Sequence, residues 1–169
     1  MLQETTSIRN KSKYLLLQEY AHFHLQANKK LISRIKTVPV TPDMKDTLLH
    51  IWQVESAWFA CLQGSHDTFQ HSCTTTLKEI SEGLAELSDK FSEYVLSLNE
   101  TQMNANVHVY IPGILDCRIP RHELLQICFD QSKYHHDQIR RMITHSGLLH
   151  PPITDFVQLK QDEGITSIA

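Results

Sequence analysis

Four segments of the 169-residue chain repeat apolar residues every three to four positions, the spacing of one face of an α-helix. They cover residues 14–35, 47–61, 77–98 and 124–142. The second segment carries two adjacent stripes, so its buried face is predicted to be wide. Helices with one apolar face each can bury those faces together. We therefore predict an all-α fold, a four-helix bundle.

Start and stop signals bracket these segments. Thr41 fits an N-cap ahead of Pro42, and residues 76–79 (TLKE) fit a capping box that opens the third helix. Gly64 and Gly147 are plausible stops for the second and fourth helices. The sequence therefore predicts the ends of the helices as well as their number.

The connections differ in length. The short link between the first two helices favours antiparallel neighbours, whereas the long helix 3–helix 4 connection can cross the bundle. Within it, VHVYI and CRI are predicted to pair as a small ribbon around Pro112-Gly113. With no repeat or linker to divide the chain, residues 1–169 are expected to form a single domain.

Composition excludes several function classes. A net charge of -3 gives no basic surface for phosphates, so no nucleic acid partner is expected. We expect no membrane span or signal peptide, and hence a cytoplasmic protein, because the sequence contains no long apolar run. The four cysteines are widely spaced and are interpreted as buried thiols rather than disulfides or zinc ligands.

Several polar residues fall on the apolar stripes. They are His24 and Asn28 in the first segment, His50 in the second, and Gln131, His135 and Gln138 in the fourth. Burying such a group unpaired costs about 1–3 kcal/mol, so each needs another side chain, water or a metal ion as partner. His136, Arg140 and Arg141 lie off the stripe and are expected on a solvated face.

Gln131 and His135 are one helical turn apart, which places their Cβ atoms about 5–6 Å from each other. With His50 from a facing helix they could converge on an ion and leave positions open for water or substrate, as catalytic sites do. The alternative is ordinary core polarity, with histidines bonded to carbonyls or water. Asn28 and Gln138 would then bond across helices, and Cys128 would be a core thiol rather than a nucleophile.

Motifs along most of the chain resemble the DinB superfamily of four-helix proteins. The segments that carry the resemblance are HLQANKKLI (24–32), LLHIWQVESAWFACLQG (48–64), FDQSKYHHDQI (129–139), SGLLHPP (146–152) and PITDF (152–156). The fourth helix of the family typically reads F-N-H-S-T-Y-H-R-G-Q-I. His50 and His135 match two of the three family histidine ligands, and the third falls on Gln131. His136-Asp137 replace the family's Arg-Gly, and Gln138 is kept.

The resemblance implies an up-down-down-up bundle, commonly a homodimer, with a divalent transition metal, zinc or nickel, at His50, Gln131 and His135. Related proteins include thiol-dependent S-transferases and a maleylpyruvate isomerase, which implies a small-molecule or thiol substrate and a thiol cofactor. Residues expected in the pocket or behind the ligands are His24, Asn28, Glu55, Cys128 and Gln138. Because glutamine lacks the basicity of imidazole, two hypotheses stand: a metal-dependent transferase or hydrolase, and a metal-free binding protein that retains the fold.

Overall fold

The computed structural model describes residues 2–65, 74–111 and 115–147. Its elements are α1 (Leu2–Ile35), α2 (Pro42–Leu62), α3 (Leu77–Ser97), α4 (Glu100–Asn104), β1 (Asn106–Ile111), β2 (Leu115–Pro120) and α5 (Arg121–His145). The four long helices confirm the predicted all-α bundle. None of the helices in these ranges is long and apolar enough to cross a membrane.

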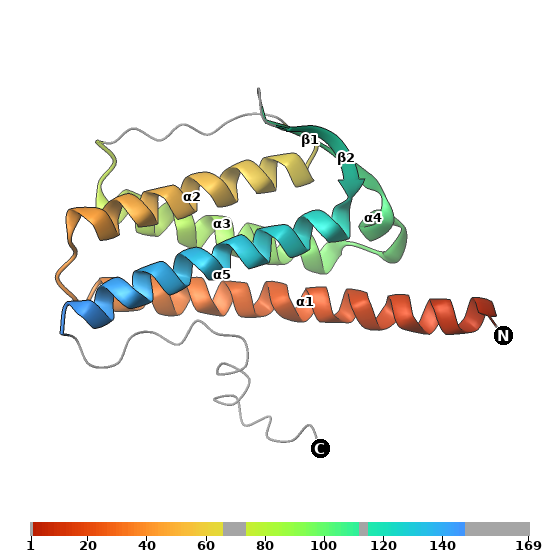
Figure 1. The fold of residues 1–169 in the computed structure, drawn as a ribbon, viewed down its shortest axis with the longest axis horizontal. Coiled ribbons are helices and arrows are strands. Elements are labelled where there is room, and N and C mark those ends of the chain that lie inside the picture. Colours follow the sequence, from red (N-terminus) through yellow and green to blue (C-terminus); the bar gives the residue numbers. More distant parts are fainter. Residues whose placement is uncertain (1, 66–73, 112–114, 148–169) are drawn as a thin grey trace, which may run out of the picture.

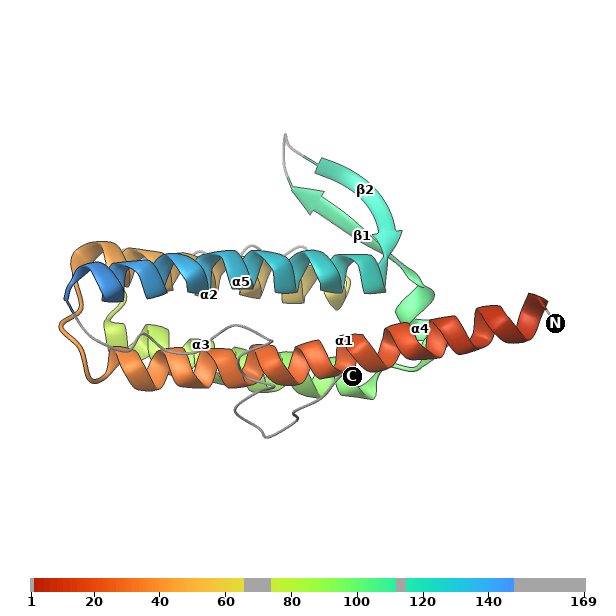
Figure 2. The same ribbon diagram turned by 60° about the horizontal axis from the view of Figure 1, so that its bottom comes forward.

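The long helices run up, down, down and up in chain order (Figure 1). Figure 2 shows two layers, with α1 and α3 in one and α2 and α5 in the other. The expectation that α1 and α2 would be neighbours is wrong, because each packs against α3 and α5 and the two are diagonal. The link 36–41 permits this, since six residues reach about 20 Å and a bundle diagonal is about 14 Å.

The predicted helix ends are confirmed. The Thr41 side chain accepts a hydrogen bond from the backbone N–H of Met44, and Thr76 forms the capping box with Glu79. Gly64 and Gly147 follow the ends of α2 and α5 with φ of +79° and +78°. Glycine adopts this left-handed conformation without the steric cost that other residues meet.

The connection between α3 and α5 holds the predicted ribbon. β1 and β2 pair antiparallel, with Val109 opposite Cys117. The expected turn at Pro112-Gly113 lies outside the described residues, as does the PITDF segment (152–156). The five-residue α4 was not predicted, because it is too short to show a helical period; Asn99 caps it, in a capping box with Gln102.

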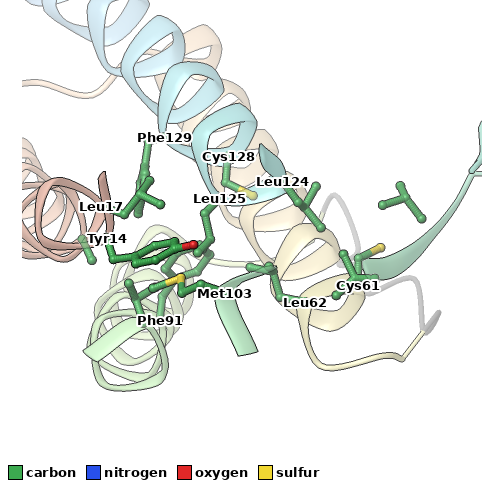
Figure 3. Packing of buried hydrophobic residues seen from close by; sticks show 14 residues of the cluster. Tyr14, Leu17, Cys61, Leu62, Phe91, Met103, Leu124, Leu125, Cys128 and Phe129 are labelled. Carbon is green, nitrogen blue, oxygen red and sulfur yellow. The ribbon is translucent and has the colours of Figure 1, made fainter. Parts of the chain in front are cut away.

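Among the described residues, the bundle core consists of two apolar clusters. One lies at the ribbon end and includes Phe91 and Leu124 (Figure 3). The other lies toward the opposite end and includes Leu31, Leu84 and Ile139. Between them along each helix come polar side chains, so a polar layer divides the apolar interior.

Candidate metal site and buried polar layer

His50 of α2 and His135 of α5 lie side by side on the face that these two helices share. Their ring centroids are 4.8 Å apart and the rings are nearly perpendicular. His50 is exposed and His135 half-buried, so the pair lies at the bundle surface. The interpretation of these two positions as core is therefore wrong, although other members of their stripes, such as Leu124 and Cys128, are buried and the two histidines do meet.

The 2.9 Å hydrogen bond between His135 Nδ1 and Gln138 Oε1 fixes the tautomer of the imidazole. An amide oxygen can only accept, so Nδ1 carries the proton and Nε2 of the neutral ring keeps its lone pair. Metal-binding histidines characteristically donate their second N–H to such an acceptor. Gln138 is half-buried, and its hydrogen bond orients His135 within the same helix. The sequence had left open a bond from Gln138 to another helix instead.

His50 is suited to the same role. Partial desolvation of its ring by neighbouring atoms, and then the nearby His135, lower the pKa of its imidazole. The neutral ring is thereby favoured, and neutral imidazole is the form that binds a metal.

Gln131, one turn before His135, is already engaged. Its Oε1 accepts a 2.7 Å hydrogen bond from the indole Nε1–H of Trp58. Among the described residues, no three His, Cys, Asp or Glu side chains gather as a metal-binding group. The available donors are two imidazole nitrogens, which suit zinc or nickel, and an amide oxygen, which is a weaker ligand.

A second polar cluster lies inside the bundle, with members from all four long helices. They are His24, Asn28, Glu55, Ser88, Ser132 and His136. The Glu55 carboxylate is 3% exposed and accepts hydrogen bonds from His24 Nε2 at 2.9 Å, Ser132 Oγ at 2.8 Å and Asn28 Nδ2 at 3.2 Å. Three donors compensate the burial of a carboxylate charge.

Asn28 links this carboxylate to the rest of the layer. Its Nδ2 also donates to Ser88 Oγ at 2.7 Å, and its Oδ1 accepts from His136 Nε2 at 2.6 Å. Ser88 Oγ donates onward to the carbonyl oxygen of Leu84. In this chain of donors and acceptors, His24 Nε2 donates to Glu55 and therefore accepts nothing from Asn28 Nδ2, which lies 3.4 Å away. His24 Nδ1 is buried without a partner in the described part of the chain.

Burial and these bonds set the charges of the layer. Burial alone would raise the pKa of Glu55. His24, through its charge and its hydrogen bond, acts together with His136 and Ser132 to outweigh burial, so the pKa of Glu55 is lowered. Burial lowers the pKa of His136 to about 4. At neutral pH the layer therefore holds an ionised Glu55 and a neutral His136.

The expectation that His136 is solvated is wrong: it is 2% exposed. The sequence does contain a signal for the burial of His136. A second stripe on α5 has more apolar residues than the stripe that contains Gln131 and His135. It runs Leu125, Phe129, Ser132, His136, Ile139, Ile143, all buried.

The other sequence candidates divide between surface and interior. His24, Asn28 and Glu55 belong to the buried layer. Cys128 is 3% exposed in the ribbon-end cluster, and burial raises the pKa of its thiol well above the ordinary value, as expected for a core thiol. Neither Cys61 nor Cys117 is in a disulfide, and Cys73 lies outside the described residues.

A family model described as the DinB family matches residues 10–165, nearly the whole chain. No curated protein matches the sequence.

Proposed function

Because the chain belongs to the DinB family, we propose that it binds a divalent transition-metal ion, zinc or nickel, between His50 and His135. The observation that carries the proposal is the pair itself: two imidazoles from different helices, 4.8 Å apart. One has Nδ1 bound to Gln138 and Nε2 available, and the other has a lowered pKa that favours its neutral form.

The two histidines would hold the ion, with Gln138 keeping the proton on Nδ1 of His135. When bound, such an ion supplies Lewis acidity that lowers the pKa of a thiol or water. A site with two protein nitrogens leaves several positions open to solvent, as substrate access requires. We propose a thiol transferase or a hydrolase acting on a small molecule.

The test is metal content, measured by elemental mass spectrometry on untagged protein purified without chelator. We expect zinc or nickel near one equivalent in the wild type and its loss in His135→Ala. His145→Ala is the matched control, because His145 is an exposed histidine of the same helix. Wild-type protein that also fails to take up added zinc and nickel would refute the proposal, as would metal retained in both His50→Ala and His135→Ala.

A second candidate is a metal-free binding protein. It is favoured by the hydrogen bond from Trp58, which occupies the Gln131 oxygen that would complete a three-ligand site. Gln131→His discriminates the two. If the wild type binds no zinc and Gln131→His does, the metal-free function is supported. If the wild type already binds zinc and Gln131→His binds it more tightly, the metal site is supported.

A further inference from the structure

A small pocket opens between α1 and α5, which lie against each other across the two layers of the bundle (Figure 2). Its volume is ≈ 60 Å³. One water molecule needs about 10–15 Å³ by the same measure, so the pocket has room for about four to six groups of that size. Neither His50 nor His135 lines the pocket, so it is separate from the candidate metal site.

One imidazole nitrogen of the buried His136 faces this pocket. Asn28 donates through Nδ2 to other side chains of the layer, so its Oδ1 is an acceptor and His136 Nε2 carries the proton. Nδ1 of the neutral ring therefore has a lone pair. In the described part of the chain no hydrogen bond engages that atom, and it is not fully enclosed. Since His136 lines the pocket, this lone pair is open to a ligand there.

His24 is the second imidazole that lines the pocket. Its Nε2 donates to Glu55 at 2.9 Å, and its Nδ1 is buried without a partner among the described residues. The rings of His24 and His136 lie nearly parallel, at 22°, with their centres 6.2 Å apart. A buried polar atom without a partner is destabilising. The two unengaged nitrogens therefore favour a polar group at the histidine end of the pocket.

The other walls of the pocket are largely apolar. Phe23 and Ala27 of α1 and Phe129 of α5 are buried there, and the ring of Tyr20 stacks on Phe129 with 6.2 Å between centres. Apolar walls with a few polar atoms at one end are the usual form of a small-molecule site. A matching ligand has a short apolar part and one polar head.

We propose that this pocket is a second binding site, for a small aliphatic ligand whose hydroxyl group donates a hydrogen bond to His136 Nδ1. A lone pair requires a donor, so a ketone or an ionised carboxylate cannot pair with it. A neutral donor is favoured over an ammonium ion for two reasons. The carboxylate of Glu55 already accepts three hydrogen bonds, and Lys133 brings a positive charge to the pocket.

The experiment titrates the full-length protein with ethanol and follows the imidazole nitrogen signals by NMR. Excess chelator is present, so the result does not depend on metal at His50 and His135. We expect the Nδ1 signal of His136 to shift and saturate, with a Kd on the order of 10 mM for so small a ligand. His145, an exposed histidine of the same helix, should not respond.

Two other small molecules test the ligand class. Acetonitrile has as many heavy atoms as ethanol but no hydrogen-bond donor, so it should give no saturable shift at His136. Ethylammonium should bind more weakly than ethanol. The proposal is overturned by an absent ethanol shift, by equal shifts at His136 and His145, by an equal response to acetonitrile, or by tighter binding of ethylammonium.

Ala27→Val tests the place of binding. Ala27 is 3% exposed and lines the pocket, so two added carbon atoms occupy the space of the ligand without removing a hydrogen bond. We expect the affinity for ethanol to fall at least about fivefold with unchanged circular dichroism. Ala85→Val, at a half-buried alanine of α3 outside the pocket, is the matched control and should bind as the wild type. Undiminished binding in Ala27→Val would overturn the proposal, and the wild-type titrations decide it if that variant does not fold.

Discussion

Replacing His136 by glutamine should reduce the acid sensitivity of the fold between pH 7 and pH 5. The pKa of His136 is about 4 in the folded protein, against an ordinary value of 6.5. The unfolded state therefore binds more protons between these values, and the free energy of unfolding falls as the pH falls through this window. The stability from the buried neutral ring is fully present above pH 6.5.

The magnitude follows from linkage. The whole difference in pKa corresponds to about 3 kcal/mol, of which about 2 kcal/mol is lost between pH 7 and pH 5. Because His136 is almost fully buried, little of this is screened by solvent. Glu55, which faces it from α2, has a lowered pKa and contributes in the same direction only at lower pH.

The assay is urea unfolding followed by circular dichroism at both pH values, with excess chelator. Glutamine keeps an N–H donor for Asn28 Oδ1 but does not titrate, so we expect His136→Gln to lose about 2 kcal/mol less than the wild type on acidification. The exposed His22 provides the control His22→Gln, which should behave as the wild type. Equal acid sensitivity in His136→Gln and the wild type would refute the assignment of a neutral buried imidazole.

Three further outcomes are expected. Asn28→Leu removes one of the three hydrogen bonds to Glu55 and the acceptor of His136 Nε2, and should lower the free energy of unfolding by about 3–5 kcal/mol in urea titrations, against less than about 0.5 kcal/mol for exposed Asn104→Leu. Thr76→Ala removes the cap of α3 and should cost about 1 kcal/mol in the same assay; no change would argue against the cap. Cys128 should resist a thiol reagent in the native protein while half-exposed Cys117 reacts, as mass spectrometry of the labelled peptides will show.

Much of the fold follows from local patterns. Apolar periodicity predicts the four long helices, and the signals at Thr41, Thr76, Gly64 and Gly147 predict where three of them begin or end, because capping depends on a few neighbouring residues. The family motif marked His50 and His135 as a pair, and the structure brings their rings together. These features are determined by the sequence alone.

The tertiary structure decided which side of α5 faces inward. Successive residues on a helix are about 100° apart, so neighbouring stripes that both contain polar residues are hard to rank by hydropathy. The inward side carries Ser132 and His136, which are buried because Glu55 and Asn28 on other helices supply their hydrogen bonds. Gln131 and His135 lack such interior partners and face outward, where the candidate metal site lies.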